Sequence, residues 1–365
     1  MVSLMERPRR LPIRPSATFP TQAWGRKDKQ RMVAHFVRRR PPLWLGRVLE
    51  GIVADHPIEF DFPDIDRWRA GNAGVEFVHV LDSGEAGPAV MVNALTHGNE
   101  VSGAIVVDAL LASGLKPRRG SLVLSFANVA AYQSFMPAHP FKSRKIDEDF
   151  NRVWARLDGQ DDSVELRRAR ELRPFVAGAD LLLDLHSMHD DGVPLMLAGP
   201  LQKGVDLARR VGTPMDIIRD KGHPSGRRMR DFGGFGDPAS PKAALLIEAG
   251  QHWRASSVTV AKDVTARFLA LTGAVEAGDL PADWHQPTPP EQRVVEVTHA
   301  VATKRGNFKF NQRYNGQQIV AKAGTVLGHD DDTPIVTPYD DCVLVMPSNH
   351  RVQPGVTIVR MGRVA

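Results

Sequence analysis

A histidine and a glutamate, three residues apart, have the types and spacing that a metal site requires. His97 and Glu100 follow the apolar run 89–95 and precede the apolar-periodic segment 101–111. This order predicts a buried strand, a tight turn and a helix. Side chains at the carboxyl end of such a strand can face one crevice, where they would supply two of the three protein ligands of a catalytic zinc. The pattern alone is weak, so other segments must supply a third ligand, a base and a substrate clamp.

Two further apolar runs end in groups that complete this chemistry. His186 ends the run 181–186, and Glu248 ends the run 243–248. If these strands are neighbours in a parallel sheet, their carboxyl ends share one edge, and we expect His97, Glu100 and His186 to bind one Zn²⁺ per chain with a position left for water. Glu248 would then be the general base. Asp184 faces the same side of its strand as His186 and either orients that imidazole or is satisfied by backbone.

A third segment has the composition of an anion clamp. Residues 144–152 read Arg-Lys-Ile-Asp-Glu-Asp-Phe-Asn-Arg and follow a long polar loop. Asn151 and Arg152 can hold a carboxylate by a guanidinium fork with amide support. Arg144 either joins them or stabilises the oxyanion that forms at the reacting carbonyl. A solvated arginine-rich face is the alternative interpretation.

Together these motifs resemble the succinylglutamate desuccinylase/aspartoacylase family of zinc carboxypeptidase-like amide hydrolases, over residues 85–365. The resemblance is carried, in order, by His97-Gly98-Asn99-Glu100, by Arg144 with Asp149-Phe150-Asn151-Arg152, by Asp184-Leu185-His186 and by Ile247-Glu248. It implies zinc binding by His97, Glu100 and His186. It also implies Glu248 as the base, Arg144 at the carbonyl, and Asn151 with Arg152 on the substrate's carboxylate.

The segment between His186 and Glu248 departs from this family. Relatives that act on N-acetylaspartate have a substrate-binding Tyr and Arg there, but this chain has no Tyr between residues 187 and 247, and its Arg227, Arg228 and Arg230 do not align clearly. The acyl group and the amino acid therefore stay open. The polar run 189–191 is compatible with a cationic substrate, such as an N-acetylated diamino acid, and equally with solvated loop residues.

The order of segments along the chain predicts an α/β fold. Alternating apolar runs and helical segments favour a doubly wound, mostly parallel sheet for residues 43–280, of the zinc carboxypeptidase-like kind. Residues 1–42 read as a basic, Pro-rich arm. Beyond a Pro-rich linker, short apolar runs separated by turn signals predict a small C-terminal all-β domain at 281–365, similar to hammerhead or barrel-sandwich carrier domains, although no lysine occupies the expected tip.

Composition limits the function classes. The chain of 365 residues has one cysteine, Cys342, which excludes an internal disulfide framework and a cysteine metal site. It carries a formal net charge of +5. It has no apolar run long enough for a membrane span and no secretory signal, so we expect a cytoplasmic location without membrane binding.

The resulting prediction is a zinc-dependent deacylase. A zinc-bound water would attack the amide of a small N-acyl amino acid, with Glu248 as the base. One alternative is a zinc carboxypeptidase that acts on short peptides, if the cleft is open. Another is a non-catalytic nucleic-acid-binding protein that uses the basic arm. Under the preferred prediction the protein does not bind nucleic acid, and it forms a homo-oligomer.

Overall fold

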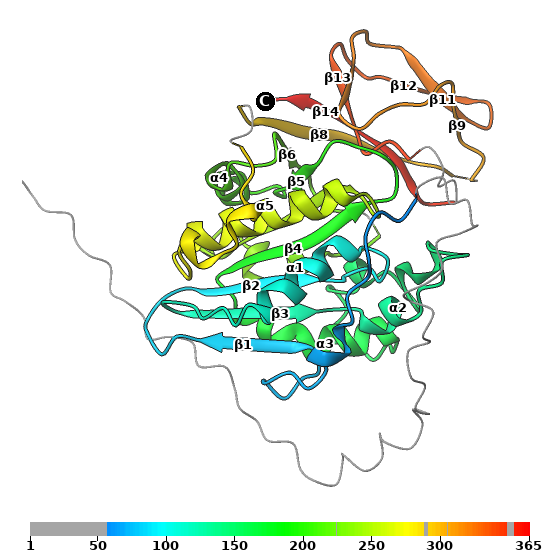
Figure 1. Cartoon of the computed structure of the whole chain (residues 1–365). Coiled ribbons are helices and arrows are strands. Elements are labelled where there is room, and N and C mark those ends of the chain that lie inside the picture. Colours follow the sequence, from blue (N-terminus) through cyan, green and yellow to red (C-terminus); the bar gives the residue numbers. More distant parts are fainter. Residues whose placement is uncertain (1–56, 224, 288–290, 305, 349–353) are drawn as a thin grey trace, which may run out of the picture.

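A computed structural model describes residues 57–223, 225–287, 291–304, 306–348 and 354–365 (Figure 1). The predicted arm at 1–42 lies outside the described residues. Within them, eleven strands form one mixed sheet in the order β1-β3-β2-β4-β7-β5-β6-β8-β14-β13-β10. These strands are β1 (Val78–Asp82), β2 (Ala89–Ala94), β3 (Ser121–Phe126), β4 (Leu181–Met188), β5 (Leu195–Leu197), β6 (Asp216–Arg219), β7 (Ala243–Gln251), β8 (Arg293–Ala302), β10 (Gln318–Val320), β13 (Cys342–Val345) and β14 (Thr357–Val364).

The middle of the sheet is parallel, as the apolar runs predicted. Strands β3, β2, β4 and β7 are consecutive neighbours and all run the same way. In this register Asn93 pairs with Asp184, and His186 pairs with Glu248. Because parallel neighbours end at one edge, the predicted meeting of these strand ends is confirmed. Within residues 57–280 four of the six pairings in this sheet are parallel, and only β1 with β3 and β5 with β7 pair antiparallel. The sheet as a whole is mixed, because β14, β13 and β10 add antiparallel pairings beyond that range.

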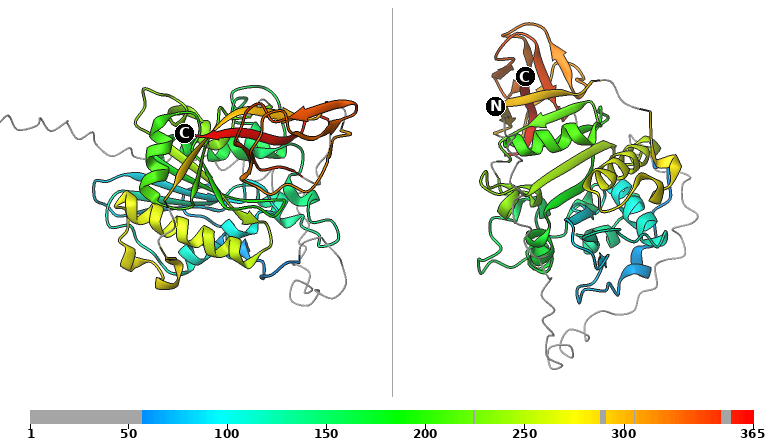
Figure 2. Two further views of the ribbon diagram at one scale, coloured as in Figure 1. Left: turned by 90° about the horizontal axis from the view of Figure 1, so that it is seen from above. Right: turned by 90° about the vertical axis from the view of Figure 1, so that its left-hand side faces the viewer.

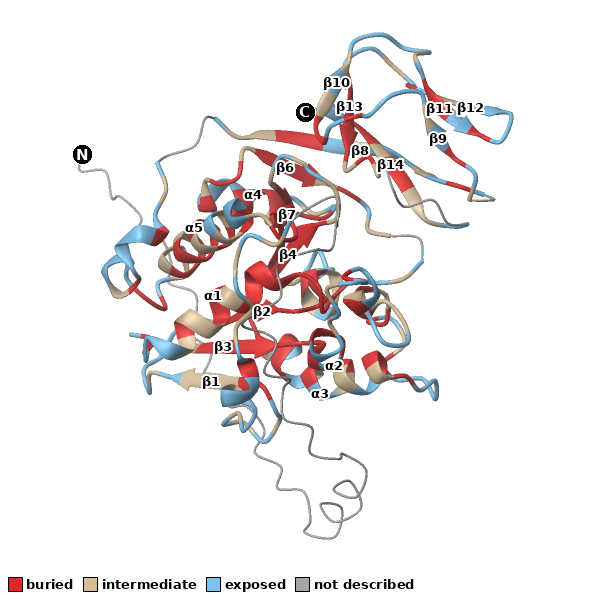
Figure 3. Ribbon diagram, turned by 45° about the vertical axis from the view of Figure 1, so that its right-hand side comes forward, coloured by how far each residue is buried: buried red, intermediate tan, exposed pale blue. Residues whose placement is uncertain are grey.

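Helices cover both faces of the sheet (Figure 2). One face packs against α1 (Val101–Ala112), α4 (Gln202–Val211) and α5 (Ala255–Thr272), which share one hydrophobic cluster with the inward side chains of β2, β4 and β7. The opposite face packs against α3 (Val164–Gly178) and the loops around residues 150 and 229. Strands buried on both faces explain the continuous apolar runs in the sequence (Figure 3). The finer doubly wound, carboxypeptidase-like assignment stays a prediction.

The C-terminal region is rich in strands but is not a separate sheet. Strand β8 pairs in parallel with β6, and β14, β13 and β10 follow it antiparallel, so the central sheet continues into this region. In the part of the chain that the structure describes, a second sheet has the order β12-β11-β9, with β9 (Lys309–Phe310), β11 (Val326–Asp330) and β12 (Thr333–Val336). The predicted domain boundary and the hammerhead likeness stay predictions. No helix in the described ranges is long and apolar enough to cross a membrane.

Candidate active site

The turn after β2 is shaped by one glycine and one strained residue. Leu95 has a positive φ of 59°, which turns the chain sharply out of the strand. At Gly98 a Cβ would lie 2.3 Å from the backbone carbon of Ala131, closer than real contacts allow. The Gly98 N–H donates to the Arg144 carbonyl oxygen at 3.2 Å. A glycine is therefore required here, because the loop that carries Arg144 packs directly on the turn that carries His97.

Three predicted ligands meet in the interior. Glu100 begins α1, and its Oε1 lies 2.7 Å from His97 Nδ1. Its Oε2 lies 2.7 Å from His186 Nδ1, and the two imidazole rings are 5.1 Å apart. One ligand atom from each residue lies within 4.8 Å of the others, and all three residues are buried. We call His97, Glu100 and His186 the ligand cluster; two imidazoles and one carboxylate are a donor set that fits zinc.

A buried network fixes the orientation of His186. Asp184 Oδ2 lies 2.8 Å from His186 Nε2. Asp184 Oδ1 accepts hydrogen bonds of 2.8 Å from Asn93 Nδ2 and from Thr96 Oγ1. With the proton on Nε2, the lone pair of Nδ1 faces Glu100 and the cluster centre. Asp184 is therefore held by side chains rather than backbone, and it has the geometry of the predicted orienting partner.

The electrostatics of the cluster suit a cation. Burial alone would raise the pKa of Glu100, but the two histidines beside it hold that pKa well below its usual range. Burial would likewise lower the pKa of His186, yet the carboxylates of Asp184 and Glu100 raise it well above its ordinary value. Both shifts arise because acidic groups and imidazoles share a site that excludes water. A positive charge is favoured at this point.

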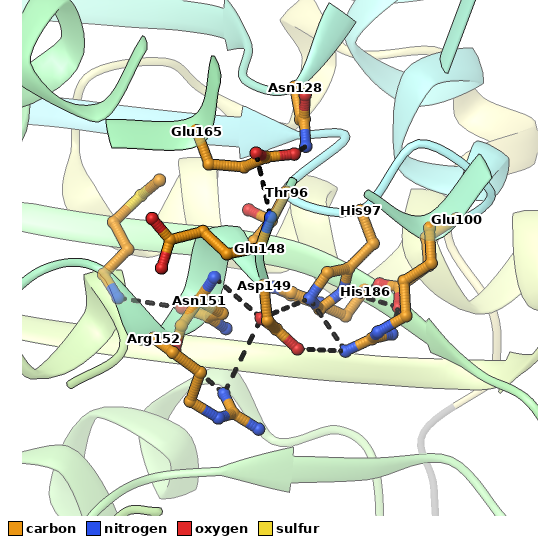
Figure 4. Close-up of polar contacts among 12 residues, drawn as sticks. Thr96, His97, Glu100, Asn128, Glu148, Asp149, Asn151, Arg152, Glu165 and His186 are labelled. Atoms are coloured by element: carbon orange, nitrogen blue, oxygen red, sulfur yellow. Dashed lines mark hydrogen bonds and ion pairs between the residues drawn. The ribbon is translucent and has the colours of Figure 1, made fainter. Parts of the chain in front are cut away.

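Asp149 connects the ligand cluster to the arginine loop, a role the sequence did not reveal (Figure 4). Its Oδ1 lies 3.1 Å from His97 Nε2, and its Oδ2 accepts from Arg144 Nη2 at 3.0 Å. Arg144 Nη1 also donates to Glu100 Oε1 at 3.0 Å, and its Nη2 lies 2.8 Å from His97 Nε2. Binding of a metal by His97 Nδ1 would put the proton on Nε2, which could then donate to Asp149 but could no longer accept from Arg144 Nη2. Arg144 therefore lies directly beside the cluster, and its predicted role at the reacting carbonyl stays a prediction.

Glu165 is a second residue that sequence reasoning missed, and it shapes the loop before Asp149. It lies in the first turn of α3 and is fully buried. Its carboxylate accepts from the backbone N–H groups of three successive residues, at 2.7, 3.1 and 3.2 Å, and from Asn128 Nδ2 at 3.0 Å. Figure 4 shows Glu165 beside Asn128 and Glu148. The three N–H groups belong to Ile146, Asp147 and Glu148. This buried anchor holds the segment that presents Arg144 and Asp149.

Asn151 and Arg152 follow Asp149 in a short 3-10 helix (Phe150–Arg152). Asn151 Oδ1 accepts from the Met229 N–H at 2.9 Å, and Asn151 is buried. Arg152 Nη1 donates to the Asn151 carbonyl at 2.8 Å and is 3.9 Å from Asp149 Oδ1. Burial lowers the pKa of Arg152 to about 10, which is still cationic at neutral pH. The Arg152 side chain retains donors that its neighbours among residues 57–223, 225–287, 291–304, 306–348 and 354–365 do not use.

Glu248 occupies the position expected for a base. It lies beside His186 in the β4–β7 ladder and is buried. Burial, with a smaller contribution from the Glu100 charge, raises the pKa of Glu248 to about 8. Among the described residues, Glu248 Oε2 has no hydrogen-bond partner. A buried carboxyl group with an unsatisfied oxygen and a pKa near neutrality is suited to accept a proton from a reacting water.

The arginines between His186 and Glu248 are engaged with the protein or exposed. Arg228 forms a bidentate pair with Asp220, at 3.0 Å for each bond. Arg230 Nη2 donates to two backbone carbonyls, and Arg227 is exposed. Asp191, in the polar run after the third ligand, lies 3.7 Å from Arg254 Nε. The interpretation of that run as a contact for a cationic substrate stays a prediction.

Comparisons with known proteins show the family of the chain. The model of the succinylglutamate desuccinylase/aspartoacylase catalytic domain matches residues 86–272. No curated protein matches the chain. Among solved structures, a succinylglutamate desuccinylase/aspartoacylase from Rhodobacter sphaeroides is similar with a TM-score of 0.58 and 18% identity, over 80% of this chain and 90% of that one.

Two further structures have a similar fold. A succinylglutamate desuccinylase from Vibrio parahaemolyticus has a TM-score of 0.57 and 16% identity, over 79% of this chain and 86% of that one. The ectoine utilization protein EutE (DoeB) from Ruegeria pomeroyi, solved with product bound, has a TM-score of 0.55 and 18% identity, over 80% and 90%. At these identities the likeness concerns the fold alone.

Proposed function

Because the chain belongs to the succinylglutamate desuccinylase/aspartoacylase family of deacylases, we propose that it hydrolyses the amide bond of a small N-acyl amino acid and depends on zinc for this activity. The supporting observation is the meeting of the ligand cluster and Glu248 at one edge of the sheet. Strands β2, β4 and β7 are far apart in sequence, and their adjacent ends bring these four side chains together.

The ligand cluster would hold the metal through Nδ1 of both histidines and a carboxylate oxygen of Glu100. A zinc ion bound there would lower the pKa of a coordinated water toward about 7 and polarise the amide carbonyl. Asp184 and Asp149 would keep the Nε2 protons of His186 and His97 in place, which fixes the ring orientation and strengthens both ligands.

The remaining residues would act on the substrate. Glu248 would accept the proton of the attacking water and deliver it to the leaving nitrogen, because its carboxyl is buried and has an unsatisfied oxygen. Arg144 would donate to the carbonyl oxygen as negative charge develops there. Arg152 and Asn151 would bind the substrate's carboxylate, which orients the amide in the site.

Metal analysis together with a substrate panel tests this proposal. The purified full-length protein, loaded with zinc, is assayed against N-acetyl and N-succinyl amino acids and against short peptides. We expect about one zinc per chain and hydrolysis of at least one N-acyl amino acid, with free amine as product. Absence of bound metal, or cleavage of peptides alone, would contradict the proposal.

A further inference from the structure

Arg152 and Arg228 approach each other because two loops are in direct backbone contact. Val153 forms an isolated parallel bridge with Arg227. At Gly226 a Cβ would lie 2.3 Å from the Arg152 carbonyl oxygen, so the two chains are as close as a glycine permits. The short 3-10 helices on either side are joined by the hydrogen bond from the Met229 N–H to Asn151. The Arg152 loop and the Arg228 loop therefore form one unit.

The register of the sheet places Arg360, in β14, on the face that carries the active site. Directly paired residues of neighbouring strands point to the same face. Glu248 is paired with Leu195 of β5, and Arg360 is paired with Val345 of β13. Leu195 and Val345 belong to one hydrophobic cluster, whose buried members are Met188, Leu195, Leu197, Ile218, Leu246, Val295, Val343 and Val345. Arg360 therefore shares a sheet face with Glu248, although it belongs to the C-terminal region.

A side-chain contact joins β14 to the segment that precedes Arg228. Thr357 Oγ1 lies 3.3 Å from His223 Nε2. Burial and then the charges of Arg152, Arg360 and Arg228 lower the pKa of His223 to about 3, so this ring is neutral among three cations. We call Arg152, Arg228 and Arg360 the arginine group. Arg360 also lies within electrostatic range of Glu248.

The arginine group carries more positive charge than its protein neighbours neutralise. Arg228 is neutralised by its bidentate pair with buried Asp220. Among the carboxylates of the described residues, Arg152 has only the longer contact to Asp149, which Arg144 already pairs with at 3.0 Å. Arg360 is half-buried, and no carboxylate of the described residues forms an ion pair with it. Two cations that repel each other in a partly desolvated place gain energy from an anion that both can contact.

We propose that Arg360 is a specificity-determining residue, and that it binds the substrate's carboxylate together with Arg152. This inference rests on the proposed deacylase function and deepens it, because it assigns a binding role to the C-terminal strands. It also identifies a basic residue for substrate recognition in a chain whose arginines between His186 and Glu248 are exposed or engaged with the protein. The ligand chemistry is a carboxylate next to an amide, and a neutral carboxamide in its place would lose the contact.

Paired substrates test this role. Zinc-loaded wild-type and Arg360→Gln proteins are assayed with the best N-acetyl amino acid of the panel and with its C-terminal carboxamide. We expect KM for the acid to rise ~10–100-fold in the variant, with a smaller change in kcat, because a charge-assisted hydrogen bond is lost. The carboxamide should be a poor substrate for both proteins and should be affected little by the substitution.

Two variants on the same strand serve as controls. Arg360→Lys should recover part of the affinity. Arg363→Gln, on the same strand at an exposed position over the Tyr339 ring, should leave KM unchanged. An unchanged KM in Arg360→Gln would overturn the inference. An equal rise for the acid and the carboxamide would also overturn it, because that result indicates a structural effect.

A binding measurement separates this inference from the proposed function. Calorimetry with the N-acetyl amino acid on the Glu248→Gln protein, with and without Arg360→Gln, reports carboxylate binding without turnover. If no N-acyl amino acid is hydrolysed but N-acetyl amino acids bind in an Arg360-dependent way, the deacylase proposal fails and the carboxylate site stands. If the Arg360→Gln substitution leaves the binding affinity unchanged, the carboxylate site is refuted.

Discussion

The ligand cluster and the arginine group lie on the same face of one sheet, yet their charges are balanced in different ways. In the ligand cluster each imidazole faces carboxylates, and the pKa shifts of Glu100 and His186 both favour a cation. In the arginine group Arg228 alone has a close carboxylate partner within the part of the chain that the structure describes. The comparison teaches that the first is built to receive a positive ion and the second to receive a negative one. The distance between them would be spanned by the substrate.

Loss of the metal should have the largest effect. Chelation, or His186→Ala, removes the group that activates water, and we expect deacylase activity to fall by at least ~10³-fold, which corresponds to several kcal/mol of transition-state stabilisation. Readdition of zinc should restore the chelated wild type but not the variant. His329→Ala, at an exposed position of β11, is the matched control and should retain metal and activity. Activity that survives exhaustive chelation would mean that the ligand cluster does not serve catalysis.

Removal of the base should have the next largest effect. Glu248→Gln keeps the shape of the side chain but cannot accept a proton, so kcat should fall ~10²–10⁴-fold. Zinc content should be unchanged, because Glu248 is not a member of the ligand cluster. Stopped-flow assays and metal analysis on the same preparation test both statements. Full activity in this variant would remove Glu248 from the mechanism.

Asp149 tests whether the two groups are independent. It contacts His97 and Arg144 and lies 3.9 Å from Arg152. Asp149→Asn should weaken zinc affinity ~10–100-fold through the loss of a carboxylate behind a metal-binding imidazole. It should also change KM, because Arg144 and Arg152 lose a shared counter-charge. Competition with a zinc indicator gives the affinity, and Asp158→Asn, an exposed aspartate, gives the control. A change in only one quantity would show that the two groups act separately.

The pH dependence of stability should give the smallest effect. The folded metal-free protein raises the pKa of Glu248 from 4.5 to about 8, so it binds this proton more tightly than the unfolded chain does. The contribution is full below about pH 4.5 and is lost as the pH rises through about 8. Relative to Glu248→Gln, metal-free wild type should therefore lose thermal stability between about pH 4.5 and 8. A difference in Tm between the two proteins that does not change with pH would contradict the raised pKa.

The sequence predicted the centre of this molecule better than its flanks. Strands β2, β4 and β7 are continuous apolar runs because helices or loops cover both of their faces, and that pattern needs no tertiary information. Strands β5 and β6 have only three and four residues, and runs this short carry no readable period. Helix α4 was also missed, although Val205, Ala208 and Val211 recur along it at helical spacing.

The residues of the candidate site also differ in whether they could be predicted from the sequence. The meeting of the ligand cluster and Glu248 could be predicted because each residue lies near or just beyond the carboxyl end of an apolar strand, and parallel strands end at a common edge. Asp149 and Glu165 could not, because the sequence does not say which acidic side chains of a charged segment turn inward. Arg360 could not be predicted from the sequence for a different reason. Its position depends on β8 joining the sheet beside β6, a pairing that crosses a Pro-rich linker and leaves no local signal.

The hydrogen-bonded ladder between β6 and β8 has a consequence for how the protein can change shape or length. A swinging motion of the C-terminal region would break main-chain bonds along this ladder, so a hinge between β6 and β8 is disfavoured. A chain that stops before β8 would expose the backbone donors and acceptors of β6. An exposed strand edge pairs with other copies of the same chain. The truncated protein should therefore aggregate rather than become an enzyme with lower substrate selectivity.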